Sequence, residues 1–426
     1  LFMSAEIDRL AGDLGAAEAG YQQVLALDPA YGDALLQLSE VYRARGDADA
    51  AAAILEQALQ GSQDNPTVAA AALVKRGNTQ AEAGDIDAAL ASYRDAIAAR
   101  ANYAAAYLQL GALLTTQERF AEALQVYQEG VAALPDDADL RLRLGQAYRR
   151  AGKNAEATEQ LERAIALAPA AWQAHLALGG LYEDSGLQMR ALDQFSITLS
   201  LAPDNLDARF RLAQAYRRTD QPQQAIQSFA DLLELPGGDA FTGAYVQMGQ
   251  AYEAVGDLDA AERRYRRATQ FEDQAAVAYY FLGRYDDAIG ALEQALAIDP
   301  DQVDAKLQLG MVYQATGDSE RALQLIGEVA ALAESNPQAA AQAYLRLGNL
   351  ARDGGDLEEA AAQYQAAQQA NPTLIAPYLQ LAQLLRSQGQ TEQAFAQIQA
   401  AVENNPNSAE AQLELGKATI ERGQFR

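Results

Sequence analysis

The sequence has no cysteine, a single histidine and no long apolar run, and each absence removes a class of function. Without cysteine there are no disulfides, thiolate metal ligands or cysteine nucleophiles. A cysteine-free composition leans towards an extracytoplasmic protein but leaves the compartment open. With His175 as the only histidine, zinc centres and histidine-based triads are excluded. No window reaches eighteen apolar residues, so we expect no membrane insertion within this chain.

Other chemical signatures are missing too. The glycines never form the phosphate-binding patterns GxGxxG or GxxxxGK[ST], and the carboxylates show no calcium-loop spacing. We therefore expect no catalytic residues, no metal, no cofactor and no enzymatic activity. The 58 acidic residues outnumber the 32 basic ones, which gives a net charge of −26. This charge argues against nucleic acid or anionic membranes as partners and favours basic or neutral ones, unless a local basic patch dominates.

What the chain does have is a repeat. Alanine is abundant and only 12 prolines interrupt helix-forming sequence, which predicts an all-α fold. A small residue, which we call the landmark, recurs at intervals of 34 and then less regularly, as Gly77, Gly111, Gly145, Gly179, Ala213, Gly249, Gly310, Gly348, Ala382 and Gly416. Around each landmark the same pattern returns, exemplified by Leu144, Tyr148, Gly152, Ala157 and Pro169. A period of this length indicates a repeat architecture.

The pattern predicts two antiparallel helices in each unit, a helix A followed by a helix B. Leu144 and Tyr148 share one stripe of helix A, and Gly152 stands where the helix ends in a left-handed residue. An aspartate that caps helix B follows several of these glycines, at Asp47, Asp85, Asp257, Asp318 and Asp356. No unit can bury its apolar stripe alone, so stability must come from neighbouring units.

On these residues the chain resembles the tetratricopeptide repeat family over essentially its whole length. The resemblance implies a right-handed superhelical solenoid of antiparallel helix pairs, whose A helices line a concave groove that commonly binds extended peptides or helices of partner proteins. We expect a single solenoid over 1–426 with about twelve repeats. The ends read as truncated half-repeats at 1–11 and 409–426, so the native N-terminus is expected to lie upstream.

Several places break the register. The intervals from Ser39, at the landmark position of the preceding unit, to Gly77 and from Gly310 to Gly348 are each 38, which predicts longer loops at 61–66 and 333–338. The interval of 36 from Ala213 to Gly249 is explained by PGGD at 236–239. The interval from Gly249 to Gly310 is 61, seven short of two periods. We assign this loss to the first half of helix A in a shortened repeat at 273–300, which would leave that helix two turns short and alter the local superhelical pitch. Tyr280 or Phe281 would then be partly exposed towards the groove.

Arginine is the best candidate for partner binding. In 141–150 and 209–218, an Arg, a Gln and a second Arg recur at i, i+3 and i+7 on one face of helix A, a face that the resemblance places in the groove. With neighbouring side chains, the predicted partner-binding residues are Arg143, Gln146, Arg149, Arg150, Arg211, Gln214, Arg217, Arg218, Tyr280 and Phe281. Their guanidinium groups would hold an acidic segment or a C-terminal carboxylate of a protein or peptide. Alternatively, these arginines pair with Asp139, Asp207, Glu183 and Asp184 within the chain.

Three other features favour a structural interpretation. The family's best-known peptide clamp needs Lys and Asn at set positions, and only Asn78 and Asn349 occupy the Asn place, without the lysines. The basic cluster 263–267 lies on a helix B and reads as solvated surface, and His175 reads as a packing residue.

The leading prediction is therefore a non-catalytic scaffold that binds a protein or peptide along its groove. One alternative is a structural protein that self-associates into a filament by solenoid stacking. Another is the recognition arm of a larger enzyme, as in tetratricopeptide-fused transferases.

Overall fold

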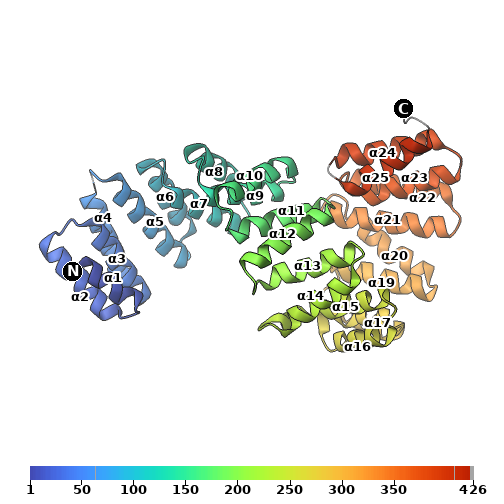
Figure 1. Cartoon of the computed structure of the whole chain (residues 1–426), viewed down its shortest axis with the longest axis horizontal. Helices are drawn as coiled ribbons and strands as arrows, with labels where there is room; N and C mark the ends of the chain where they lie inside the picture. Colours follow the sequence, from blue (N-terminus) through green and yellow to red (C-terminus); the bar gives the residue numbers. More distant parts are fainter. Residues whose placement is uncertain (63, 407, 423–426) are drawn as a thin grey trace. The chain divides into compact units, whose positions relative to one another are not determined.

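The computed structural model describes residues 1–62, 64–406 and 408–422, and within these residues it contains helices and no strand (Figure 1). The all-α fold predicted from the composition is confirmed. Contacts divide the chain into two compact units, Leu1–Leu181 and Tyr182–Arg426, which we call unit 1 and unit 2.

The first unit contains α1 (Phe2–Leu10), α2 (Leu14–Leu27), α3 (Gly32–Ala44), α4 (Ala48–Gly61), α5 (Pro66–Glu82), α6 (Ile86–Ala99), α7 (Ala104–Thr116), α8 (Phe120–Ala133), α9 (Ala138–Arg150) and α10 (Asn154–Leu167), and its boundary falls within α11 (Trp172–Asp184). The second unit continues with α12 (Gln188–Leu201), α13 (Leu206–Arg218), α14 (Pro222–Glu234), η1 (Gly238–Ala240), α15 (Gly243–Ala254), α16 (Leu258–Ala268), α17 (Glu272–Phe281), α18 (Tyr285–Ile298), α19 (Val303–Thr316), α20 (Ser319–Ala330), α21 (Pro337–Asp353), α22 (Leu357–Ala370), α23 (Ile375–Ser387), α24 (Thr391–Asn404) and α25 (Ala409–Glu421).

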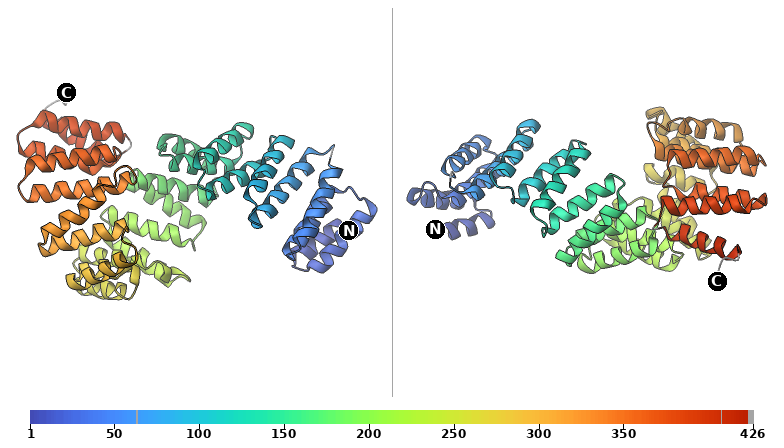
Figure 2. Two further views of the ribbon diagram at one scale, coloured as in Figure 1. Left: turned by 180° about the vertical axis from the view of Figure 1, so that it is seen from behind. Right: turned by 90° about the horizontal axis from the view of Figure 1, so that it is seen from above.

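Within each unit, an odd-numbered helix A packs against the even-numbered helix B that follows it, and each pair packs against the next pair (Figure 2). This is an α-solenoid of antiparallel helix pairs. No pair forms a closed core of its own, because each leaves an apolar face that only its neighbours cover.

The turns between helix A and helix B follow the sequence pattern. Gly152 has a φ of +70°, in the left-handed region that glycine adopts without steric cost. After the turn, Asp47 accepts a hydrogen bond from the backbone N–H of Ala50 at 3.0 Å, which caps α4 as predicted. Glu118 and Asp220 stand in two turns where the glycine is missing, and both keep a positive φ.

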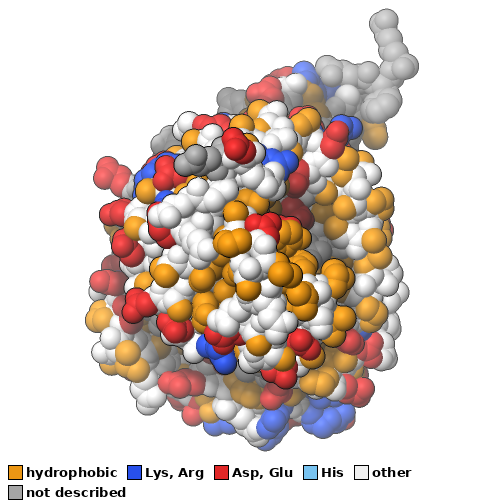
Figure 3. Space-filling view, turned by 90° about the vertical axis from the view of Figure 1, so that its left-hand side faces the viewer, with side chains coloured by type: hydrophobic (Ala, Val, Ile, Leu, Met, Phe, Trp, Pro, Cys, Tyr) orange, Lys and Arg blue, Asp and Glu red, His pale blue; other side chains and the backbone are white. Residues whose placement is uncertain are grey.

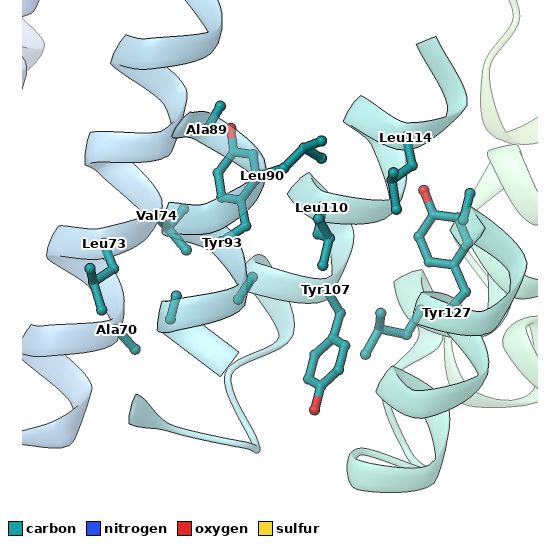
Figure 4. Packing of buried hydrophobic residues seen from close by; sticks show 14 of the residues in the cluster. Ala70, Leu73, Val74, Ala89, Leu90, Tyr93, Tyr107, Leu110, Leu114 and Tyr127 are labelled. Atoms are coloured by element: carbon teal, nitrogen blue, oxygen red, sulfur yellow. The ribbon is translucent and has the colours of Figure 1, made fainter. Parts of the chain in front are cut away.

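The landmark residue lets helix B approach helix A. A Cβ added to Gly77 would lie 2.5 Å from Cε1 of Tyr93, so the ring of Tyr93 occupies the space that a larger residue would need. Figure 4 shows Tyr93 and Tyr127 among the buried residues of this core, with Leu110 between them. Each tyrosine comes from a helix B and fills the space against its own helix A.

The position four residues before the landmark also has a structural use. Arg141, His175 and Arg209 each hydrogen-bond the carbonyl of the proline that ends the preceding helix B, at 2.7, 3.2 and 2.8 Å. These bonds tie each helix A to the turn that follows the preceding helix B. The packing role predicted for His175 is confirmed, since the residue is buried and its Nε2 donates to the carbonyl of Pro169.

The longer loop predicted at 61–66 is not found, because the extra residues belong to a helix. The α4 helix ends at Gly61 and α5 begins at Pro66, and α5 has 17 residues where the regular α7 has 13. The extra residues therefore lengthen helix A by one turn. Pro66 suits the first helical position, where no backbone N–H is needed, and the same arrangement begins the 17-residue α21 at Pro337.

The two residues inserted before α15 form a short wall. Gly237 has a φ of +82°, the 3₁₀ helix η1 follows, and Phe241 then packs against Phe210 of α13 with ring centroids 5.2 Å apart. A Cβ on Gly238 would overlap the carbonyl group of Leu232, so only glycine allows this close approach.

The seven-residue loss is shared between two helices, which corrects the prediction. A regular helix B such as α10 has 14 residues and a regular helix A such as α9 has 13, whereas α16 has 11 and α17 has 10. The connection between them loses the remaining residue. The α17 helix is therefore about one turn short, not two. Because each helix loses three residues, the neighbouring α16 and α17 remain similar in length.

Candidate partner-binding groove

The A helices of unit 2 line a groove with two cavities. The larger has a volume of about 560 Å³ and is lined by Phe210, Arg217, Ala240, Phe241, Thr242, Gly243, Val246, Gln247, Gln250, Gln274 and Val277. The smaller has a volume of about 260 Å³ and is lined by Gln250, Ala276, Val277, Tyr280, Phe281, Leu292, Gln308, Met311 and Val312. Because Gln250 and Val277 line both, the cavities adjoin, and we call them together the unit 2 groove.

The repeat register explains which side chains reach the groove. Relative to the landmark of each helix A, many of the lining residues lie two positions before it, one after it or four after it. In α15, whose landmark is Gly249, these include Gln247 and Gln250. In α17 the landmark is Ala276, 34 residues before Gly310, and the corresponding residues are Gln274, Val277 and Tyr280. Helix α19 continues the series with Gln308 and Met311. Positions three or four apart share one helix face, so successive A helices present one continuous surface.

Arg217 is the cation of the larger cavity. It lies four residues after the landmark of α13, is partly buried, and has no carboxylate within 4 Å among the described residues. Its Nε has no hydrogen-bond partner, and neither does Oε1 of Gln247 in the same cavity. Burial and then the charge of Arg218 lower the pKa of Arg217, although arginine remains cationic at neutral pH. The cavity therefore contains a positive charge without a counter-ion.

The neighbouring arginines of α13 are engaged within the chain. Glu183, whose side chain is 13% exposed, accepts hydrogen bonds from Arg211 at 3.0 Å and from Arg218 at 2.5 Å. Arg211 also donates to Asp207 at 2.9 Å. For Arg211 and Arg218, these ion pairs agree with the alternative prediction that the arginines pair with carboxylates of the chain itself. Gln214, one residue after the landmark, is partly buried on the same helix.

The predicted residues of unit 1 are placed differently. Arg143 and Gln146 are exposed and hydrogen-bonded to each other at 3.3 Å, and Arg150 lies over the ring of Phe120 at 4.5 Å. Arg149 is partly buried against α11, where a Cβ on Gly180 would lie 2.8 Å from its Nη1. Neither Arg143 nor Arg150 has a carboxylate within 4 Å in the described part of unit 1.

Tyr280 and Phe281 are partly exposed, as predicted from the shortened repeat, and both line the smaller cavity. Phe281 stacks on Tyr265 with centroids 5.2 Å apart, and Tyr280 meets Phe281 edge to face at 5.4 Å. A second arginine with no carboxylate within 4 Å among the described residues, Arg346, lies two residues before the landmark of α21. Burial lowers the pKa of Arg346, and the neighbouring Tyr280 partly offsets this.

The asparagines at the clamp position have partners inside the chain. The hydroxyl of Tyr93 donates to Asn78, and the hydroxyl of Tyr364 donates to Asn349, both at 2.8 Å. These bonds fix each amide against its own helix B.

The basic cluster of α16 is likewise held on the surface. Arg266 pairs with Glu262 at 2.6 Å, and Arg267 lies over the ring of Phe271 at 5.3 Å. In the residues described, no group of three potential metal ligands occurs, and no helix has the length and apolar character needed to cross a membrane.

Sequence reasoning missed the amide and apolar lining of the groove. Gln247, Gln250, Gln274 and Gln308 carry no charge or motif, and they stand out only when the units are aligned by landmark, since a glutamine then recurs two positions before it in three successive units.

Four sequence profiles of the tetratricopeptide repeat match the chain. The first matches residues 9–74, 114–179 and 282–346, and the second matches 74–138 and 189–240. The other two match residues 375–418, and residues 242–275 and 341–374. Together these matches extend over most of the sequence.

Among curated proteins, human protein O-mannosyl-transferase TMTC1 is 24% identical over 169 residues, which is 30% of this chain and 19% of that protein. Among solved structures, yeast Tom70 is 16% identical with a TM-score of 0.43, covering 83% of this chain and 88% of its own. YrrB, a tetratricopeptide repeat protein with an unusual peptide-binding site, is 18% identical with a TM-score of 0.36, covering 50% of this chain and 97% of its own. At these identities the structures are similar in fold alone.

Proposed function

Because this chain belongs to the tetratricopeptide repeat family, we propose that it is a protein-interaction scaffold whose unit 2 groove binds an extended segment of a partner protein. The observation that carries the proposal is where the cavities lie. The larger is walled by the inserted segment that ends at Phe241, and the smaller is lined by the shortened α17. The groove is open at the place where the repeat departs twice from its period.

The lining suits a peptide. Amide side chains such as those of Gln247 and Gln274 both donate and accept hydrogen bonds, so they can pair with the backbone of an extended segment whatever its sequence. Apolar side chains such as Val277 and Met311 provide the buried contact area between these polar points. A concave, partly apolar surface with a few placed polar groups is the usual form of a binding site.

The proposal is tested by selecting binders from a random peptide library displayed on phage. We expect enrichment of peptides whose binding to the chain is lost in Gln250→Trp, which fills the junction of the two cavities. Leu258→Trp is the matched control, because Leu258 is 67% exposed on α16, outside the groove lining, and its replacement adds a ring without changing the charge. Enriched peptides that bind both variants equally would place binding elsewhere and contradict the proposal.

The scaffold function is compatible with a larger enzyme. The similarity to the mannosyl-transferase extends over only 19% of that protein, so its activity is not carried over to this chain. A groove that recognises a peptide would serve equally as the recognition arm of an enzyme or as an independent scaffold.

Self-association is a second candidate, favoured by an exposed apolar stripe on α1. Met3, Ile7 and Leu10 recur on one helix face and are 70%, 64% and 75% exposed. Figure 3 looks onto this side of the molecule, where hydrophobic side chains gather with acidic ones around them. Light scattering tests the idea: Ile7→Glu should reduce the apparent mass if the stripe mediates assembly, whereas a dilution-stable monomer would rule assembly out.

A further inference from the structure

We propose that the partner segment carries one carboxylate that binds Arg217 in the larger cavity and one large apolar side chain, about three to six residues away, that fills the smaller cavity. This inference rests on the proposed function of the unit 2 groove and specifies the chemistry of its ligand.

Arg217 selects the carboxylate because it is the arginine lining the groove that the chain itself leaves without a counter-ion. Arg211 and Arg218 are already bound by Glu183, whereas Arg217 has an unpaired Nε and no carboxylate within 4 Å among the described residues. Its planar guanidinium can form two parallel hydrogen bonds with a carboxylate. Gln247 lines the same cavity, and its side-chain amide can hydrogen-bond the backbone of the same segment.

The smaller cavity selects an apolar side chain by its lining and size. Phe281 and Tyr280 form one wall, with Phe281 fixed by its stacking on Tyr265, and Met311 forms another. At about 260 Å³, the cavity is smaller than the roughly 300–1,000 Å³ typical of sites for drug-sized ligands, which fits a single side chain. Methionine adapts to different shapes, so aromatic and long aliphatic side chains should both be accepted.

The distance between the two anchors follows from helix packing. Arg217 is on α13 and Tyr280 is on α17, with α15 between them, and the cavities meet at Gln250 of α15. Packed helices lie about 8–10 Å apart, and an extended chain advances about 3.3 Å per residue. Crossing one to two helix spacings therefore takes about three to six residues.

The net charge limits the segment to few carboxylates. A chain with a net charge of −26 repels a polyacidic peptide over a distance of about one Debye length. The local cations Arg217 and Arg346 oppose this only near the groove. A segment with one carboxylate gains the local attraction and suffers less of the general repulsion.

The test uses the peptides that the phage library yields on the full chain. We expect the enriched sequences to share one Asp or Glu about three to six residues from Phe, Tyr, Trp, Leu or Met. For the strongest synthetic peptide, measured by fluorescence polarisation, exchanging the acid for its amide should weaken binding about tenfold or more. Arg217→Gln should weaken the acidic peptide equally and remove the difference between the two peptides, while Arg218→Gln, the adjacent exposed arginine, should retain it.

Further measurements distinguish a side-chain carboxylate from a C-terminal one. They also distinguish a failure of this inference from a failure of the proposed function. A peptide that has the amide in place of its acid but keeps a free C-terminus tests whether a terminal carboxylate replaces the side chain. If Arg217→Gln also weakens this peptide, Arg217 binds either source. Groove-dependent binding of peptides without a carboxylate, or an acid preference that survives Arg217→Gln, would overturn this inference and leave the proposed function standing. Absence of any binding sensitive to Gln250→Trp would overturn both.

Discussion

The ring of Tyr364 lies so close to the backbone of Gly348 that a Cβ on Gly348 would be 2.5 Å from Cε1 of the tyrosine. Tyr364 is fully buried, and its hydroxyl donates to Asn349, the residue after the glycine. The same relationship joins Gly77 to Tyr93 in unit 1. The landmark is therefore small because a side chain from helix B occupies its space, and the 34-residue period records this packing constraint.

Gly348→Ala should destabilise unit 2 by about 1–3 kcal/mol, because the added methyl must displace a buried ring. The loss should appear as a lower urea midpoint with an unchanged slope. Gly290→Ala is the control, since a Cβ there meets no heavy atom within 4 Å and alanine favours the helix by roughly 0.5–1 kcal/mol. An equal response of the two variants would contradict the packing explanation.

Much of the fold could be predicted because the repeat is a local constraint. The turn at Gly152 and the cap at Asp47 are each specified by one residue with one strong conformational preference, and the structure has both. The extra residues before α5 were harder to place. The sequence Asn65-Pro66 reads as a loop, yet the same pair begins a helix, with Asn65 as the cap and Pro66 in the first turn.

The site was less predictable because it depends on where long side chains find partners. Arg217 and Arg218 are adjacent and chemically identical, but Glu183 accepts from Arg218 while Arg217 lines the cavity. That choice follows from the face of α13 on which each residue lies and from the position of Glu183. The loss of seven residues posed a similar problem, because the period counts missing residues without showing that α16 and α17 share them.

Gly238→Ala should disturb the wall of the larger cavity, since a Cβ there would overlap the carbonyl of Leu232. We expect a loss of about 1–3 kcal/mol in stability and weaker peptide binding, because Phe241 would no longer be held against Phe210. Urea unfolding and fluorescence polarisation measure the two effects. Gly327→Ala, with no heavy atom within 4 Å of the added Cβ, should leave peptide binding unchanged and raise stability by roughly 0.5–1 kcal/mol.

Glu183→Gln should destabilise unit 2 by about 1 kcal/mol, because the partly exposed Arg211 and Arg218 lose their shared carboxylate. Asp207→Asn is the matched control. It removes only an i,i+4 pair with Arg211 whose carboxylate is 48% exposed, and should cost less than about 0.5 kcal/mol. If the groove binds acidic segments, Glu183→Gln should also strengthen their binding, since it removes one negative charge from the vicinity of α13. Unchanged stability in Glu183→Gln would show that the pairs contribute little.

Alkaline pH should unfold the chain through its buried tyrosines. Burial raises the pKa of Tyr127 and of Tyr364 above the ordinary value of 10.0, so the folded state keeps these phenols protonated where the unfolded chain releases the protons. By linkage, the stability is intact below pH 10 and falls as the pH rises above it, by at most about 1.4 kcal/mol per pH unit for each tyrosine.

Circular dichroism and phenolate absorbance, followed together, measure this effect. The buried tyrosines, whose pKa is raised in the folded state, should become phenolates in the same transition in which helicity is lost. In Tyr127→Phe, the loss of stability between neutral and alkaline pH should be smaller than in the unaltered chain, because one raised pKa is removed while the net charge at neutral pH is unchanged. The comparison uses the difference between the two pH values, so any constant effect of losing the hydroxyl cancels. Equal alkaline losses in the two proteins would assign the transition to general charge repulsion and not to the buried phenols.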